Sequence, residues 1–478
     1  MEKQKFDQLV LKIKRAGSPV DLVRLEKALT AVLSAASACQ ALDVALLLAD
    51  WLVDEDLLLA GLLYGLVENG QMSDQKLEKD FGVSVAKLVT GVTRVGNLKL
   101  PSQQQEVLVE NLRKLIVAMA KDLRVVLIKL ADRVNLLQTL YLVPFQQQEQ
   151  LAREIMEVYA PLADRLGISE VKSNLEDLSF AYLEPEKYQQ TIDLANQFLK
   201  KAEIDLKQIK KQLLLGLAKG SISAQINTRT KGVYSLYCKL ARKEIDHDIN
   251  KVFDLIALRI IVNNIEDCYA VLGLVHQLFK PLPLGISDFI AQPKPNGYRS
   301  IHTKVFAGHR VIEIQIRTEQ MHQESEWGVA AHWHYVQMKQ GQISDERIEK
   351  GFFTPDDKVG WVKELVAWQQ EVTDSKELIK SLKLDALKKR IFVFTPQGDV
   401  YDLPSGATPV DFAYQIHSAL GDSCQGARVD GRWVPLSFRL KSGQTVEVIS
   451  AKNKKPSADW LKFVITKKAR DKLKKITS

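Results

Sequence analysis

Apolar residues recur at helical spacing from about residue 20 to residue 170, in a stretch rich in Leu and Ala and poor in Gly and Pro. Pro101 interrupts this pattern and marks a loop between helices. The helical pattern continues over residues 175–220, where mixed charges from Lys200 to Lys211 indicate a solvated face. The first 220 residues are therefore predicted to be almost entirely helical.

The pattern changes at about residue 222, where short β-branched runs begin to alternate with helical stretches. The runs at residues 257–262, 305–306 and 311–316 read as strands. This alternation predicts an α+β domain with its sheet centred on residues 255–317.

A second strand-rich unit is predicted near the end of the chain. Residues 341–386 are polar and then helical, which is typical of a connector. Beyond them, residues 391–394 and 445–449 have the composition of strands, and residues 396–399 (Pro-Gln-Gly-Asp) form a turn. These features predict a compact β-rich module.

Size and composition are those of a multidomain globular protein. A chain of 478 residues has room for about three domains. No run of about 18 apolar residues is present, so no membrane partner is expected. The four cysteines are dispersed without a CxxC pair, which argues against a disulfide framework or zinc site and favours the cytoplasm.

Positive charge is concentrated in one segment. Residues 452–475 hold ten Lys or Arg against Asp459 and Asp471, a net of +8. The whole chain also has a formal charge of +8, so the remainder is about neutral. Such a segment is either a solvated helix face or a surface for a polyanion.

The candidate chemistry lies in two neighbouring segments. In residues 312–317, Glu313, Gln315 and Arg317 share one face of a strand, while the three Ile residues between them share the other, buried face. A preceding turn (Pro-Asn-Gly, 295–297) exposes Tyr298 between Lys294 and Arg299. The ring can stack a base, the cations can hold phosphates, and the carboxylate can bind metal or accept a proton. We interpret this pairing as a nucleotide site.

These two segments resemble the synthetase domain of the RelA/SpoT family, which makes the alarmone (p)ppGpp. The resemblance covers roughly residues 20–475 and implies a multidomain fold of α and α+β type. The expected parts are a degenerate helical HD (pseudo-hydrolase) domain at 1–175, a nucleotidyltransferase-like mixed-sheet synthetase domain with leading helices at 176–340, a helical connector at 341–386, a β-grasp TGS domain at 387–451, and the basic start of a helical domain at 452–478.

The resemblance implies an ATP side and a metal ligand. The segment 229–235 (Arg-Thr-Lys-Gly-Val-Tyr-Ser) matches the family segment that holds ATP, and it implies ATP contacts by Arg229, Lys231 and Lys239. Asp254, at the entrance of a buried strand, matches a catalytic Mg²⁺ ligand. Arg259, a charge within that apolar strand, needs a partner and is assigned to the ATP side.

The resemblance also implies an acceptor side for GTP or GDP. Tyr298 matches the residue that stacks guanine. Glu313 is the catalytic candidate to orient or deprotonate the ribose 3′-hydroxyl, with a possible share in metal binding. The other acceptor-site residues carried over are Lys294, Asn296, His302, Gln315 and Arg317.

One segment departs from the family. Before Asp288 the family carries Arg-x-Lys-Asp in bifunctional members or Glu-x-Asp-Asp in synthetase-only members. This chain has Gly285-Ile286-Ser287-Asp288, so only the last carboxylate remains. The number of metal ions and the choice between GDP and GTP are therefore left open.

The N-terminal third lacks the histidines of a working HD hydrolase. In the family, two His and two Asp hold the hydrolytic metal. None of the eight histidines lies in the first 246 residues: Gln40 replaces the first His, Tyr64-Gly65 the His-Asp pair, and only Asp132 survives. One carboxylate alone makes a site of negligible affinity. We expect a pseudo-hydrolase domain that regulates the synthetase.

Residues 392–414 resemble a TGS domain, in which His417 matches a position that reads the end of uncharged tRNA. The resemblance therefore implies the ribosome and uncharged tRNA as partners, and no DNA. The expected function is a GTP pyrophosphokinase that makes (p)ppGpp from ATP and GTP or GDP with Mg²⁺. The alternative is a catalytically silent regulator that binds tRNA or the ribosome through the TGS unit and the basic tail.

Overall fold

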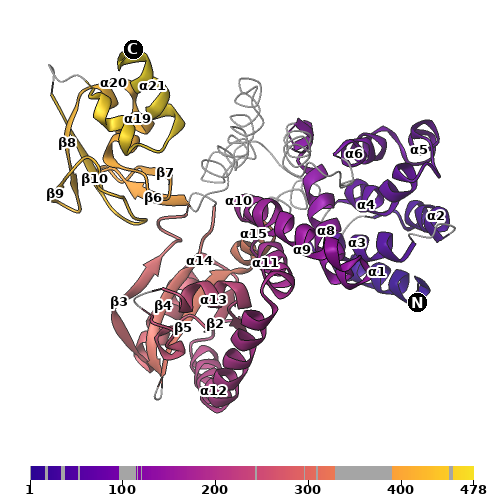
Figure 1. Cartoon of the computed structure of the whole chain (residues 1–478). Helices are drawn as coiled ribbons and strands as arrows, with labels where there is room; N and C mark the ends of the chain where they lie inside the picture. Colours follow the sequence, from indigo (N-terminus) through magenta and orange to yellow (C-terminus); the bar gives the residue numbers. More distant parts are fainter. Residues whose placement is uncertain are drawn as a thin grey trace, which may run out of the picture. The chain divides into compact units, whose positions relative to one another are not determined.

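The computed structural model describes most of the chain (Figure 1). The described residues are 2–16, 20–33, 38–51, 54–95, 115, 117–119, 121–242, 245–294, 297–307, 310–328, 390–451 and 456–477. They fall into two units, residues 1–370 and 371–478. The predicted connector at 341–386 lies outside the described residues.

The first unit begins with helices packed around one apolar core. The central helix, α8, is buried along most of its length, which explains why its sequence lacks a polar stripe. Asp54 is the N-cap of α4, and its side chain accepts a hydrogen bond of 2.7 Å from the N–H of Leu57. The elements are α1 (Glu2–Ala16), α2 (Leu22–Leu33), α3 (Ala38–Asp50), α4 (Glu55–Glu68), α5 (Asp74–Phe81), α6 (Val83–Arg94), α8 (Arg124–Gln138), η1 (Leu140–Leu142), α9 (Phe145–Glu154), the π-helical η2 (Ile155–Tyr159), α10 (Ala160–Arg165) and α11 (Ser169–Leu183).

A long helix leads into the mixed sheet. Pro185 occupies the first turn of this helix, where its missing N–H costs nothing. The sheet order is β1-β2-β5-β4-β3, in which β2 and β5 are parallel and the other neighbours antiparallel. The elements are α12 (Pro185–Lys219), β1 (Ala224–Thr230), α13 (Val233–Leu240), η3 (Ile249–Lys251), β2 (Ile256–Val262), α14 (Ile265–Leu278), β3 (Lys280–Asp288), β4 (Ile301–Ala307), β5 (Arg310–Thr318) and α15 (Glu319–Trp327).

The apolar face of this sheet is covered by α12 and α14. Ile314 and Ile316 of β5 pack with Leu213 of α12 and Val271 of α14 in one core cluster. The other face of the sheet carries the polar side chains of the candidate site.

The second unit is smaller and combines short strands with helices (Figure 1). Thr408 and Asp411 form a capping box that begins α19. The elements are β6 (Arg390–Phe394), β7 (Val400–Pro404), α19 (Pro409–Ile416), α20 (Ser418–Asp422), β8 (Cys424–Val429), β9 (Arg432–Val434), β10 (Val446–Ser450), η6 (Ala458–Lys462) and α21 (Lys467–Thr477).

Candidate active site

The register of the sheet gathers the predicted polar residues on one face. Gln315 of β5 is paired with Arg259 of β2 on one side and with His302 of β4 on the other. Glu313 and Arg317 lie two residues before and after Gln315, so they point to the same side. Glu313, Gln315 and Arg317 are all buried. The polar face is therefore interior, which limits contact with bulk water and strengthens electrostatic interactions there.

Glu313 is held by two neighbours. Gln315 Nε2 donates a hydrogen bond of 2.8 Å to Glu313 Oε1, and His302 Nδ1 lies 3.3 Å from the same oxygen. Burial raises the pKa of Glu313, but the hydrogen bonds from His302 and Gln315 outweigh it, so its pKa lies below the usual value. Glu313 is therefore an oriented, ionised carboxylate able to accept a proton.

His302 links Glu313 to Tyr298. The hydroxyl of Tyr298 lies 2.7 Å from His302 Nε2. Burial lowers the pKa of His302, although the adjacent Glu313 opposes the shift. A neutral ring with its proton on Nδ1 satisfies both contacts, because it donates to Glu313 and accepts from Tyr298. His302 was predicted to contact the acceptor nucleotide, but here both ring nitrogens face protein groups.

Two cations lie near the Tyr298 ring. Lys294 Nζ is 4.9 Å from the ring centroid, and Arg317 Cζ is 5.6 Å from it. The ring is half-buried rather than exposed as predicted. Phe289 adds a second ring, 4.4 Å from Lys294 Nζ. Asn296, the remaining residue predicted for this side, lies outside the described residues.

A second cluster joins the residues predicted for ATP and metal. Asp254 accepts hydrogen bonds from Lys231 (3.1 Å) and Lys239 (2.6 Å). Burial raises the pKa of Asp254, but the two ammonium groups outweigh it and the pKa lies below the usual value. Arg229 Nη1 lies 3.5 Å from Gln315 Oε1 and so connects this side to the Glu313 face.

The partner of Arg259 comes from α15. Glu326 Oε1 lies 3.0 Å from Arg259 and 3.6 Å from Arg317. His322 Nδ1, one turn earlier on α15, lies 3.7 Å from the same oxygen. The two guanidinium groups are close enough to repel each other. Burial and the charge of Arg317 lower the pKa of Arg259 to about 10. The Nε atoms of both arginines lack a hydrogen-bond partner among the described residues.

The sequence prediction did not include His322 and Glu326. Their i, i+4 spacing on a helix directly after the polar strand was a signal that they share one face. That they meet Arg259, 67 positions before Glu326, follows only from the folded sheet.

Asp288, the carboxylate left in the departing segment, has a structural role. It accepts hydrogen bonds of 2.9 Å from the N–H groups of Ile290 and Ala291 and one of 3.0 Å from the Tyr269 hydroxyl. Ser287 pairs with His302 across the β3–β4 ladder, so a neutral residue faces the site at this position.

The residues of the helical region that were compared with the family's hydrolytic metal site contact one another. The hydroxyl of Tyr64 donates a hydrogen bond of 2.8 Å to Asp132, and Gln40 Nε2 lies 3.4 Å from the same oxygen. Arg133 lies 3.8 Å from the other oxygen of Asp132. Across the described parts of the chain, no group of three or more His, Cys, Asp or Glu side chains could hold a metal ion.

In the second unit, His417 caps a helix and α21 shares the core. His417 Nδ1 accepts a hydrogen bond of 3.2 Å from the N–H of Ala419, and its ring remains exposed. Ala469 and Leu473 of α21 are buried with Tyr414 of α19. Lys468 Nζ lies 3.2 Å from the carbonyl of Gln415, so the basic helix begins beside the His417 loop.

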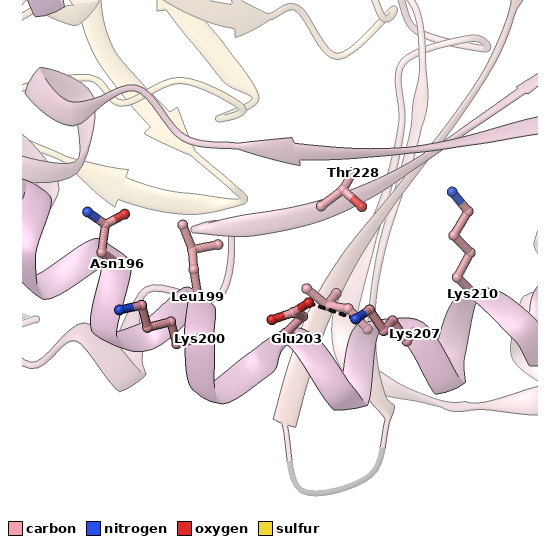
Figure 2. Close-up of a pocket in the computed structure, with 8 residues that line it drawn as sticks. Asn196, Leu199, Lys200, Glu203, Lys207, Lys210 and Thr228 are labelled. Carbon is pink, nitrogen blue, oxygen red and sulfur yellow. Dashed lines mark hydrogen bonds and ion pairs between the residues drawn. The ribbon is translucent and has the colours of Figure 1, made fainter.

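A separate groove lies between α12 and the edge strand β1 (Figure 2). It is lined by Lys200, Lys207 and Lys210, with Thr228 on the strand, and Glu203 forms an ion pair of 2.7 Å with Lys207. Thr228 is paired with Leu258, whose side chain lies in the apolar core. The groove is therefore on the face of the sheet opposite to Glu313.

Among the described helices, none is long and apolar enough to cross a membrane.

Three family models match the chain. Residues 33–169 match an HD domain, residues 228–340 match the region found in RelA/SpoT proteins, and residues 391–450 match a TGS domain. Together with the helical region, the mixed sheet and the strand-rich end, these matches confirm the predicted fold class and family resemblance.

Some similar proteins are named as synthetases of the alarmone and others as hydrolases. A GTP pyrophosphokinase of Myxococcus xanthus is 42% identical over 91% of this chain and 56% of its own length. A guanosine-3′,5′-bis(diphosphate) 3′-pyrophosphohydrolase of Aquifex aeolicus is 42% identical over 91% of this chain and 60% of its own. The small alarmone synthetase 1 of Bacillus subtilis, bound to pppGpp, is 26% identical over 37% of this chain and 98% of its own, with a TM-score of 0.25. The chain thus spans less than two thirds of the two long relatives.

Proposed function

We propose that this chain, a member of the RelA/SpoT family, is a GTP pyrophosphokinase that transfers the β,γ-pyrophosphate of ATP to the 3′-hydroxyl of GTP or GDP. The products are AMP and (p)ppGpp. The observation that carries the proposal is the ionised Glu313, fixed by Gln315 and His302, beside the Tyr298 ring and the cations around Asp254.

The ATP side consists of cations that are already gathered. Lys231 and Lys239 surround Asp254, and Arg229 lies at the edge of the same face. Phosphoryl-group transfer relies on positioning and on stabilising negative charge, which such cations supply. When the triphosphate binds, the two ammonium groups exchange their carboxylate contact for phosphate oxygens. Arg259 extends this side towards α15.

The acceptor side positions the nucleophile. Tyr298 stacks the guanine base of the acceptor nucleotide. Lys294 and Arg317, both near the Tyr298 ring, bind the phosphates of GTP or GDP. Glu313 accepts the proton of the ribose 3′-hydroxyl. At the same time the 3′-oxygen forms a bond to the β-phosphorus of ATP. The bond from that phosphorus to the α-phosphate oxygen breaks, and AMP leaves with that oxygen. Gln315 and His302 keep Glu313 oriented during this step.

The donor set suits Mg²⁺. This ion prefers hard oxygen ligands and is commonly held by one or two carboxylates together with substrate phosphates. Asp254 and Glu313 are both ionised and close enough for repulsion between them to act on the pKa of Glu313. We assign the metal to Asp254 with a share for Glu313. When bound, it would neutralise phosphate charge.

We further propose that the helical domain does not hydrolyse the alarmone. Tyr64 and Gln40 satisfy Asp132 in place of a metal ion, and the neighbouring guanidinium of Arg133 would repel a cation. The described residues of the domain form an apolar core, so the domain keeps the means to regulate the synthetase by packing.

The proposed partners beyond the substrates are uncharged tRNA and the ribosome. The exposed ring of His417 directly follows helix α19, whose last turn accepts a hydrogen bond from Lys468 of the basic helix α21 at the Gln415 carbonyl. These groups offer one selective contact and several phosphate contacts. The alternative is a catalytically silent regulator that binds tRNA or the ribosome through the TGS unit and the basic tail, and it would use the same surface.

Thin-layer chromatography of labelled ATP with GDP or GTP tests the proposal. We expect a slower-migrating guanosine product that carries the label of the γ-phosphate, together with AMP. Absence of this product with folded protein, Mg²⁺ and both nucleotides would favour the silent regulator.

A further inference from the structure

Helix α11 belongs to two parts of the first unit at once. Val171 and Leu175 are buried in the core of the N-terminal helices. On the opposite side of the helix, Asp177 and Phe180 face α13, the helix of the ATP side. The domain boundary predicted at residues 175 and 176 falls within this helix.

Asp177 caps a helix that has no cap of its own. The N-cap position of α13 is Gly232, which provides no side-chain hydrogen bond. Asp177 Oδ1 instead accepts a hydrogen bond of 2.9 Å from the backbone N–H of Tyr234. A carboxylate at this end also complements the positive end of the helix dipole.

The close approach of α11 depends on the glycine. A Cβ at Gly232 would lie 2.5 Å from Ser173 Oγ and 3.0 Å from Asp177 Oδ2. The contact is widened by Phe180, whose ring centroid is 5.3 Å from that of Tyr234 and 4.9 Å from that of Tyr237. The start of α13 is therefore fixed by α11 rather than by its own sequence.

The cations of the ATP side lie on either side of this cap. Lys231 directly precedes Gly232, and Lys239 is in the last turn of α13. Both must reach Asp254, at 3.1 Å and 2.6 Å. A shift of the start of α13 would change both distances. Helix α11 also packs against α15, whose Glu326 contacts Arg259 and Arg317, so the cap on α13 is the contact that acts on the ATP side alone.

We propose that Asp177 is a positioning residue for ATP, through which the N-terminal helical core sets the geometry of Lys231 and Lys239. This inference rests on the proposed function and adds a reason for a helical domain without its metal ligands to stay folded against the synthetase. Release of the Asp177 cap would change ATP affinity while His302 and Glu313 keep their places on β4 and β5.

Binding measured in the full chain separates this role from general stability. The probes are a non-hydrolysable ATP analogue with Mg²⁺ and, separately, GDP, each titrated by calorimetry. For Asp177→Ala we expect analogue affinity to fall roughly 2- to 30-fold, the range that loss of one helix cap implies, with GDP affinity unchanged. Asp177→Asn should restore most of it, because Asn is also a good cap.

The matched control is Asn264→Ala. Asn264 caps α14 through a hydrogen bond of 2.7 Å from the N–H of Asp267, on the apolar side of the sheet. The Asn264→Ala variant should have a lower melting temperature than the wild type, without a selective loss of affinity for the ATP analogue. If Asp177→Ala does not fold, Gly232→Ala provides the test, since its Cβ would displace the Ser173 hydroxyl and the Asp177 carboxylate while every charge remains.

The outcomes are distinct. Unchanged analogue affinity in folded Asp177→Ala or Gly232→Ala would overturn the inference, as would equal losses for the analogue and GDP. Wild-type protein that binds neither nucleotide would reject the proposed function itself and, with it, this inference.

Discussion

The hydroxyl of Tyr298 lies 2.7 Å from Nε2 of His302. The other nitrogen of that ring faces Glu313, so the residue proposed to stack the base is connected to the residue proposed to take the proton. Burial keeps the pKa of His302 low, and a neutral ring can serve both neighbours only as the Nδ1-protonated tautomer. In the proposed function, acceptor binding and general-base orientation are therefore coupled through these three side chains.

Tyr298→Ala should weaken acceptor binding and spare ATP. Base–aromatic stacking is worth roughly 1–3 kcal/mol, so GDP affinity should fall ~5- to 150-fold in calorimetry. Tyr298→Phe is the matched control, because it keeps the ring and removes only the hydrogen bond to His302. Equal loss of ATP and GDP affinity in Tyr298→Ala would show that the ring is only structural.

Glu313→Gln should lower turnover with little effect on nucleotide affinity. The substitution keeps the shape and removes the charge, and loss of a general base costs ~10²-fold or more. Initial rates with saturating ATP and GDP provide the measurement. Glu319→Gln, at the exposed start of α15, is the control and should retain activity. Retained turnover in Glu313→Gln would reject its assignment as the base.

The sequence predicted those features that depend on local periodicity. Alternation along β5 placed Glu313, Gln315 and Arg317 on one face, and the register confirms that they share it. The family resemblance placed Lys231, Lys239 and Asp254 in one site, and they form one ion cluster. Their catalytic and binding roles stay predictions.

Features that depend on distant contacts could not be predicted. The burial of the polar face requires α15, which packs against β2 and β5, and the Glu326–Arg259 pair joins elements far apart in sequence. Strand β3 was also missed, because Pro281, Pro283 and Gly285 disfavour strands in general. They are tolerated here since β3 is at the edge of the sheet.

Alarmone hydrolysis should be absent. Labelled ppGpp incubated with Mn²⁺ should release no pyrophosphate above a metal-free blank, because the described N-terminal region offers no metal-binding group of three ligands. Tyr64→Phe should not restore it, as it frees Asp132 without adding an imidazole. Metal-dependent release by the wild type would refute the pseudo-hydrolase proposal.

The stability of the helical region should fall as the pH rises from about 4.5 to 7. Burial raises the pKa of Glu154 to about 7, against the opposing charge of Arg133. In this range the unfolded chain ionises Glu154 while the folded chain keeps the proton, so folding loses up to ~3 kcal/mol. Urea unfolding of Glu154→Gln should lack this component, whereas Glu149→Gln, exposed on the same helix, should behave as wild type. Identical pH profiles for wild type and Glu154→Gln would contradict the prediction.

Binding of uncharged tRNA should depend on two separate features: the positive charges of α21, which set the salt dependence, and the His417 ring, which sets the preference for uncharged tRNA. Deleting residues 452–478 would expose the core, because Trp460, Ala469 and Leu473 are buried there, so the charges must be removed in place. Lys472 and Lys474 are exposed on α21. Removing one lysine–phosphate interaction reduces the slope of log K against log salt by about 0.7–0.9.

Lys472→Gln combined with Lys474→Gln should therefore flatten that slope by up to ~2 in filter binding across salt. His417→Ala should leave the slope unchanged and erase the preference for uncharged over aminoacylated tRNA, since a single exposed ring reads the terminal nucleotide rather than the phosphates. Because His417 also caps α20, His417→Asn serves as the control that retains a cap. If His417→Asn keeps the preference, the ring has only its capping role. If the wild type has no affinity for tRNA or ribosomes, this proposed partnership is wrong.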